Sequence, residues 1–364
     1  MRVFHVIARL DIGGAERVAL NIASNPHSEV EYHIVEVVRS TTRTAASLID
    51  ECQRGGVPVH RFIFPNWQFH YLPQKVAAWL FPLWFLWVYR RHRPDVIHTH
   101  TEIPDLAVCA FFKLFPGLLR HTRVVRTIHN NVLWSGMRRV GGWVERFMQR
   151  QQANVAISQS VRDSYERAYG VRVERLIYNG VAEPAAQESP RREDGKIHIL
   201  FAGRFEQQKG IDTLISIVSR ASAEIYTFTI VGAGRMEETL RAALAGRGNV
   251  TLLPAIPHLA THLARYDYLL MPSLFEGLPL LPIEAALARV PVLANLAPGL
   301  RETLPEEWLL AVHDNDEAEW DKLFAEVLPH ADRSALAEQL HAFALAHFSL
   351  QRMRESYEDV YRTT

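Results

Sequence analysis

The chain has 364 residues, of which 48% are hydrophobic and 22% charged, and its formal net charge is zero. This composition describes a soluble globular protein with an ample core, and the length suffices for two domains of ordinary size. The two cysteines, Cys52 and Cys109, argue against a disulfide framework and indicate a reducing compartment.

Charge is distributed unevenly along the chain. Residues 1–180 contain 23 Lys/Arg and 14 Asp/Glu, a balance of +9, whereas residues 181–364 contain 17 and 26, a balance of −9. A basic N-terminal half indicates an anionic partner surface. Because no cluster of aromatic and basic residues matches a nucleic-acid module, we expect this partner to be a membrane or an acidic glycolipid.

Short β-like runs alternate with helical stretches between residues 3 and 180. This alternation predicts a parallel sheet with crossover helices. The first apolar run is too short for a signal peptide and passes directly into a glycine turn. The predicted strands are Val3–Ala8, Tyr32–Val38, Val57–Phe62, Val96–Thr99, Val124–Ile128, Asn154–Ile157 and Val173–Ile177.

One segment in this half departs from ordinary helix composition. It runs through Trp79, Trp84 and Trp87 into the basic residues Arg90, Arg91 and Arg93. Its apolar run contains Pro82 and is too short to span a bilayer. Aromatic rings followed by cations suit a membrane interface, so we interpret the segment as a peripheral membrane contact. The alternative is a core helix whose basic end complements its own dipole.

A second alternation follows a polar, proline-bearing stretch, residues 182–195, which we interpret as an inter-domain linker. Its predicted strands are Ile197–Phe201, Thr227–Val231, Val250–Leu253, Tyr268–Met271, Val290–Ala294 and Trp308–Val312. The prediction is therefore an α/β protein with two Rossmann-like, doubly wound domains, residues 1–181 and 196–345, facing a central cleft. A C-terminal helix, 346–364, completes the chain. Ligands of such sheets bind at the carboxyl ends of the strands.

The loop after the strand Ile197–Phe201 carries two cations, Arg204 and Lys209, between glycines at 203 and 210. An arginine fork and a lysine point charge can clamp a diphosphate, and glycines let the backbone approach it. A solvated surface loop is the alternative. The next strand leads through Gly232 into a helix predicted at 236–244, as in nucleotide-binding α/β folds, although these glycines do not complete a dinucleotide fingerprint.

A proline-punctuated turn links the strand Tyr268–Met271 to a helix predicted over Ile283–Arg289. Two glutamates bracket this turn: Glu276 is placed at its lip and Glu284 in the first helical turn. The backbone N–H groups of Gly277, Leu278 and Leu280 lie in a turn, which Pro279 completes, that points a positive dipole end at a ligand. The alternative is that Glu284 complements the dipole and Glu276 is solvated.

Together these motifs resemble the family 4 glycosyltransferases of the retaining GT-B type, over roughly residues 3 to 300. The N-terminal half adds Gly13 and Gly14, the pair His98 and His100, His129 followed by Asn130, and Asn179 followed by Gly180. The resemblance implies two Rossmann-like domains and transfer of a sugar from a nucleotide-sugar donor. It also implies that the C-terminal helix crosses back onto the N-terminal domain.

The resemblance assigns roles to individual residues. Arg204 and Lys209 stabilise the leaving diphosphate, supported by backbone N–H groups of the Gly277–Leu281 turn and of the Gly13–Gly14 loop. Glu284 accepts hydrogen bonds from the ribose, Glu276 lies nearest the donor sugar, and His129 contacts that sugar. Alternatives remain: Arg204 pairs with Glu206 or another acid, and His129 is a core histidine.

The arrangement needs no metal and no cofactor beyond a donor substrate, a UDP- or GDP-sugar. We expect His98 and His100 to point to opposite faces of their strand, a poor geometry for chelation, with at least one of them structural. Asn130 and Asn131 stand where many relatives carry an acid, so the leaving phosphate itself is a candidate acceptor of the proton.

The leading interpretation is a cytoplasmic retaining glycosyltransferase, peripheral to the inner face of the membrane, that extends a lipid-linked or cell-surface glycan such as a polysaccharide or lipopolysaccharide. Another GT-B enzyme, a nucleotide-sugar epimerase, is the first alternative, and a phosphorylase lacks a clear pyridoxal-phosphate lysine motif. A non-catalytic scaffold that binds a nucleotide sugar is the last. The retained Arg204, Lys209, Glu276 and Glu284 argue against a scaffold.

Overall fold

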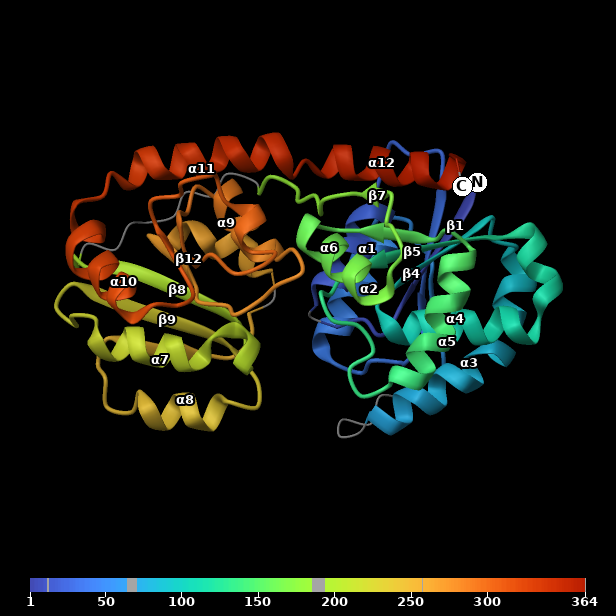
Figure 1. Cartoon of the computed structure of the whole chain (residues 1–364), viewed down its shortest axis with the longest axis horizontal. Helices are drawn as coiled ribbons and strands as arrows, with labels where there is room; N and C mark the ends of the chain where they lie inside the picture. Colours follow the sequence, from blue (N-terminus) through green and yellow to red (C-terminus); the bar gives the residue numbers. More distant parts are fainter. Residues whose placement is uncertain (12, 64–70, 185–193, 257, 364) are drawn as a thin grey trace. The chain divides into compact units, whose positions relative to one another are not determined.

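A computed structural model describes residues 1–11, 13–63, 71–184, 194–256 and 258–363. The chain divides into two compact units, one formed by Met1–Gly180 with Leu350–Thr364 and the other by Val181–Ser349. Of the predicted linker, residues 185–193 lie outside the described part. Each unit is a parallel sheet flanked by helices (Figure 1), which is the Rossmann-like architecture expected from the alternating pattern.

The first unit contains a seven-stranded sheet of order β3-β2-β1-β4-β5-β6-β7, in which every pair of strands is parallel. Its strands are β1 (Arg2–Ile7), β2 (Glu31–Glu36), β3 (Val59–Arg61), β4 (Val96–His100), β5 (Arg123–Ile128), β6 (Asn154–Ala156) and β7 (Arg175–Leu176). Its helices are α1 (Gly14–Ala23), α2 (Arg43–Arg54), α3 (Tyr71–His92), α4 (Glu102–Leu114), α5 (Arg138–Arg150), α6 (Gln159–Tyr169) and α12 (Leu350–Thr363). All seven predicted strands are present, and the two edge strands are shorter than predicted.

The second unit contains a six-stranded parallel sheet of order β10-β9-β8-β11-β12-β13. Its strands are β8 (Ile197–Arg204), β9 (Tyr226–Ala233), β10 (Val250–Leu253), β11 (Tyr268–Met271), β12 (Val292–Asn295) and β13 (Ala311–Val312). Its α-helices are α7 (Ile211–Arg220), α8 (Glu237–Ala243), α9 (Leu280–Leu287), α10 (Glu317–Lys322) and α11 (Arg333–His347). The last strand is shorter than predicted, because Trp308 packs on the sheet through its indole N–H, which donates to the carbonyl of Val292.

Helix α3 is continuous through Pro82 and has two different faces. Phe81, Phe85 and Val88 are fully buried, and Phe85 packs edge-on against Phe111 of α4. The other face exposes Trp79 and Trp87, whose exposed fractions are 54% and 63%, together with Leu80 and Leu83. The core-helix and surface-helix interpretations therefore each describe one side of the same helix.

Trp84 does not belong to the exposed face of α3, contrary to the sequence prediction. Its ring is partly buried, with centroids 5.3 Å from Phe62 and 5.6 Å from Phe81. Trp84 and Trp87 are three positions apart, slightly less than one full turn, so their rings point about 60° apart around the helix axis. None of the helices in the described part of the chain is both long and apolar enough to cross a membrane.

The final helix, α12, belongs to the first unit, where it packs against α1 (Figure 1). Two of its tyrosines are buried in that unit. The Tyr357 hydroxyl lies 2.8 Å from Thr127 Oγ1, and the Tyr361 hydroxyl lies 2.8 Å from His98 Nδ1. The side chain of Arg354 donates to backbone carbonyls of Asn21 and Ser24 at the end of α1. Residues far apart in sequence thus complete one core.

Candidate active site

In the second unit, the loop after β8 brings Lys209 against Glu276. Lys209 ends a short 3-10 turn, Gln207–Lys209, and its Nζ donates to Glu276 Oε1 at 2.6 Å. Both side chains are largely buried, with exposed fractions of 17% and 7%. The two strands that carry these loops, β8 and β11, are neighbours in the sheet, so their carboxyl ends lie side by side. The sequence placed both residues near a donor but did not predict this ion pair.

Two glycines with positive φ permit the close approach of these loops. Gly210 follows Lys209 with φ of +69°, and a Cβ there would lie 2.0 Å from the carbonyl oxygen of Pro272. Gly299 has φ of +76°, and a Cβ there would lie 2.1 Å from the carbonyl oxygen of Glu276. A side chain at either position would therefore both strain the backbone and push the Glu276 loop away.

Two asparagines that the sequence analysis did not single out hold the start of the same loop. Asn295, at the end of β12, donates to the carbonyl of Ser273 at 2.9 Å and accepts from the N–H of Asn315 at 3.0 Å. Asn315 in turn donates to the carbonyl of Pro272 at 2.9 Å. The only sequence signal was an asparagine at the end of a predicted strand.

Arg204 is the last residue of β8 and its side chain is exposed. The alternative that it pairs with Glu206 is not what the structure shows, because Glu206 Oε2 binds the guanidinium of Arg235 at 2.7 Å. Hydrogen bonds from Arg235 hold the pKa of Glu206 below its usual value. The Arg204 guanidinium thus remains at the same sheet edge as Lys209. Gly232 lies in β9, directly opposite Gly203 of β8.

Helix α9 begins at Leu280, with Pro279 as its N-cap, so Glu284 lies in the second turn and not in the first as predicted. The helix starts three residues early because Pro282 needs no N–H partner inside a first turn. Glu284 is half-buried, as is Gly277, whereas Leu278 is buried. In the first unit, Gly13 is the N-cap of α1 and Gly14 is its first residue.

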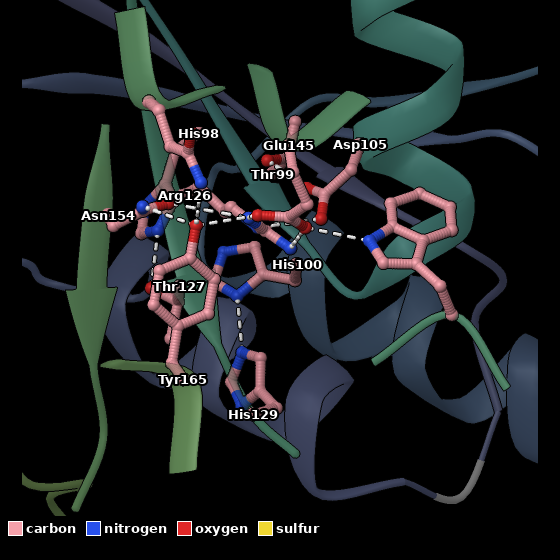
Figure 2. Close-up of polar contacts among 12 residues, drawn as sticks. His98, Thr99, His100, Asp105, Arg126, Thr127, His129, Glu145, Asn154 and Tyr165 are labelled. Atoms are coloured by element: carbon pink, nitrogen blue, oxygen red, sulfur yellow. Dashed lines mark hydrogen bonds and ion pairs between the residues drawn. The ribbon is translucent and has the colours of Figure 1, made fainter. Parts of the chain in front are cut away.

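His129 follows β5 and ends a chain of buried imidazoles in the first unit. Its Nε2 lies 3.0 Å from His100 Nδ1, and His100 Nε2 lies 2.9 Å from His5 Nδ1. Figure 2 shows His129 pointing toward His100. Burial lowers the pKa of both His5 and His129 to about 3. Burial, followed by the neighbouring imidazoles, lowers the pKa of His98 and of His100 well below the usual value. The imidazoles of this histidine chain are therefore neutral at physiological pH.

The prediction that His98 and His100 point to opposite faces of their strand is wrong. Side chains alternate with a period of two, so residues two apart share a face. The two ring centroids are 4.2 Å apart. Both are structural: His98 contacts Tyr361 and Thr127 through its two nitrogens, and His100 links His5 to His129.

A buried ion cluster underlies the same sheet edge. The guanidinium of Arg126 contacts Asp105 Oδ2 at 2.8 Å and Glu145 Oε1 at 2.7 Å, as Figure 2 shows. Trp134 and Tyr165 also donate to Glu145, at 2.7 and 2.6 Å. Burial alone would raise the pKa of Glu145, but Arg126 and these donors hold it below its usual value. Burial raises the pKa of Asp105 to about 7, against the attraction of Arg126. The cluster fixes β5 directly before His129.

Solved structures of known proteins share the fold of this chain. The fold matches that of the Anabaena protein HepE, solved in complex with UDP and glucose, with a TM-score of 0.79, 18% identity and full coverage of both chains. A sucrose-phosphate synthase from Thermosynechococcus elongatus matches with a TM-score of 0.73 and 16% identity, covering 100% of this chain and 98% of that one. The two sheets therefore have the GT-B fold.

Sequence models identify the family. Residues 196–330 match the model for glycosyl transferases group 1, and residues 12–183 match that for Glycosyltransferase Family 4. The chain belongs to this family of GT-B glycosyltransferases.

Curated relatives match only part of the chain. A protein of the cps region of Klebsiella pneumoniae is 28% identical over 58% of this chain and 63% of its own length. A Mycobacterium tuberculosis glycogen synthase is 27% identical over 59% of this chain, and the match spans only 55% of that enzyme. The capsular polysaccharide biosynthesis glycosyltransferase CapH of Staphylococcus aureus is 21% identical over 78% of each chain. The chain thus spans less than two thirds of the first two of these relatives.

The buried histidines predict how stability depends on pH. Because their pKa values are depressed in the folded state, their contribution is fully present above about pH 6.5 and is lost as pH falls toward 3. Each contributes a slope of about 1.4 kcal/mol per pH unit in this window. His129→Gln, which keeps a polar group where Nε2 lies, should reduce the proton uptake on unfolding by about one.

Urea unfolding between pH 4 and 7, followed by tryptophan emission, measures this slope. The exposed His27 supplies the matched control, since His27→Gln should leave the slope unchanged. An identical slope for His129→Gln and the parent protein would contradict a neutral, buried His129.

Proposed function

We propose that the chain is a retaining glycosyltransferase that moves a sugar from a nucleotide-sugar donor to a lipid-linked or cell-surface glycan. The Lys209–Glu276 ion pair at the carboxyl edge of the second sheet is the observation that carries the proposal. It combines a cation for a leaving diphosphate with a carboxylate for an anomeric carbon that becomes cationic. Family membership and the HepE complexes with UDP, UDP-glucose, or UDP and glucose support a UDP-sugar donor.

In this mechanism Arg204 and Lys209 stabilise the negative charge of the leaving diphosphate. Glu284 accepts from the ribose hydroxyls, and the turn at Gly277–Leu280 offers N–H groups at the start of α9. Glu276 holds hydroxyls of the donor sugar while the hydrogen bond from Lys209 holds its carboxylate in place. His129, neutral at working pH, acts as a hydrogen-bonding group toward the sugar and not as a cation. No metal or cofactor takes part.

The relative from a cps region and the capsular polysaccharide biosynthesis glycosyltransferase CapH support a role in polysaccharide assembly. An acceptor carried on a lipid would place the protein at the cytoplasmic face of a membrane. The exposed apolar face of α3, followed by Arg90, Arg91 and Arg93, has the composition for peripheral binding to an anionic surface.

Donor binding is the first test. We expect UDP-sugars or GDP-sugars, screened as a panel, to raise the Tm by binding the folded state. Nucleoside diphosphate should be released only when acceptor is present, which distinguishes transfer from epimerisation.

Arg204→Ala and Lys209→Ala should each weaken binding of the bare diphosphate and cut turnover by roughly a hundredfold or more. Arg220→Ala, which removes an arginine at the far end of α7 that pairs with Glu317 and Asp321, should change neither. Unaltered diphosphate affinity in both loop variants would remove them from the site.

Substitution of the two glutamates separates their roles. Glu284→Ala should raise the donor KM, because a ribose contact is equal in the ground and transition states. Glu276→Gln should mainly depress kcat, because its charge matters as the anomeric carbon becomes cationic.

Because Glu276 touches Lys209, their alanine variants should be non-additive, with a coupling of about 0.5–3 kcal/mol in a double-mutant cycle. Steady-state kinetics measures the changes in KM and kcat and the coupling. The assays contain EDTA, because we expect activity to survive metal chelation. The opposite KM and kcat pattern would exchange the two roles.

Membrane contact is tested with lipid vesicles. The protein should co-sediment with anionic vesicles, weakly with zwitterionic ones, and less as salt rises. Replacing Arg90, Arg91 and Arg93 with Gln should cost about 3 kcal/mol of partitioning, since each cation near the surface contributes about 1 kcal/mol.

The matched control replaces Arg162, Arg167 and Arg172 with Gln, which removes the same charge on and just after α6. Equal loss of binding in both triple variants would show general attraction to the basic unit and no docking by α3. Undiminished binding in the α3 variant would exclude this helix from the contact.

A further inference from the structure

Three histidines outside the candidate active site meet where β2, the edge strand β3 and the end of α3 lie together. His33 lies on β2, His60 on the neighbouring edge strand β3, and His92 at the end of α3. One ring nitrogen from each lies within 4.8 Å of the others. The rings also pack closely, with centroid distances of 5.1 Å between His33 and His60 and 4.8 Å between His60 and His92.

The nitrogens are oriented for coordination. His33 Nδ1 lies 2.8 Å from His60 Nε2, while His33 Nε2 contacts Glu31 Oε1 at 2.9 Å. When the Nε2 proton is donated to Glu31, the Nδ1 lone pair faces His60 Nε2. A carboxylate behind a histidine ligand is the arrangement that orients imidazoles in metal sites.

Charge and access also favour a cation. The nearby guanidinium of Arg2 is paired with the second oxygen of Glu31 at 2.7 Å and also donates to the carbonyl of His92. His33 is buried, but His60 and His92 are only half-buried, which leaves a path from solvent.

We propose that His33, His60 and His92 bind a divalent ion of the zinc class, with Glu31 positioning His33. Zinc binds imidazole at about 2.0–2.1 Å, which in a tetrahedron places the nitrogens about 3.4 Å apart. The His33–His60 pair, now 2.8 Å apart, opens to this distance when the ion replaces the proton between its nitrogens and His60 takes its other tautomer. The third nitrogen, within 4.8 Å of the others, moves closer. Three protein ligands leave a fourth position for water. The bound ion would hold the end of α3 against β2 and β3.

The other convergent set, His5, His98 and His100, is a weaker candidate. All three rings are fully buried, and both nitrogens of His98 already contact Tyr361 and Thr127. An ion there would have to displace Tyr361 or Thr127 from His98, whereas an ion at His33 replaces only a hydrogen bond between two of its own ligands. The two clusters share no residue, so substitutions separate them.

Isothermal titration of ZnCl₂ into the full chain, free of purification tags and stripped with EDTA, tests the proposal. We expect one equivalent to bind and to raise the Tm. His92→Ala should weaken zinc binding by at least about a hundredfold, and Glu31→Gln by about 10–100-fold, the usual effect of losing an outer partner. His27→Ala, an exposed histidine of the same unit, is the matched control and should bind normally. Co²⁺ should give the visible absorption of a tetrahedral nitrogen site, lost in His92→Ala.

Two results would overturn the proposal. One is the absence of a zinc-dependent rise in Tm together with no tetrahedral Co²⁺ spectrum. The other is stoichiometric binding that persists in both His92→Ala and Glu31→Gln, which would assign the ion to another site. His92→Gln, with far-UV circular dichroism as a check, replaces His92→Ala if that variant does not fold. The Tm reports on the zinc site and turnover reports on sugar transfer. Chelation that lowers the Tm but not turnover would show that the zinc site is independent of sugar transfer.

Discussion

Every strand pair in both sheets is parallel, and this constraint determines where the chemistry can lie. Parallel strands send all their following loops to one edge, so residues distant in sequence meet there. Lys209 follows β8 and Glu276 follows β11, and the two meet because those strands are neighbours. His129, which follows β5, and His100, which ends β4, meet for the same reason. The short distances at each site are thus a consequence of sheet topology.

Most of the polar groups buried at these edges are paired, although His5 Nε2 has no hydrogen-bond partner among the described residues, and the two units achieve the pairing differently. The first unit uses a guanidinium shared by two carboxylates, together with a chain of neutral imidazoles. The second unit uses backbone carbonyls bound by Asn295 and Asn315. In both, an unpaired group in the interior would cost about 1–3 kcal/mol, so the networks are held in one arrangement.

The order of strands and helices followed from the alternation of apolar runs, because that periodicity reflects burial directly. The edge strands β7 and β13 were predicted too long, since an apolar residue such as Trp308 signals burial and not strand pairing. The start of α9 was misplaced because the prolines obscured which residue is the N-cap. His98 and His100 were wrongly predicted to point to opposite faces, because side chains two residues apart on a strand point to the same face.

What the sequence could not supply was pairing between side chains. The contact of Lys209 with Glu276 depends on strand order, and the partner of Glu206 depends on where Arg235 emerges from β9. Gly299 and Asn295 act through backbone carbonyls of another loop, which leaves no pattern in their own neighbourhood.

The placement of α12 has a consequence for biosynthesis. Tyr357 and Tyr361 supply hydroxyl partners for Thr127 and His98 inside the first unit, yet they are translated after the whole second unit. On the ribosome, the first sheet therefore lacks these hydroxyl partners for Thr127 and His98 while the second unit is being made. A nascent chain in that interval exposes apolar surface that chaperones recognise. The order of completion is thus reversed: the unit synthesised later is the first that can finish folding.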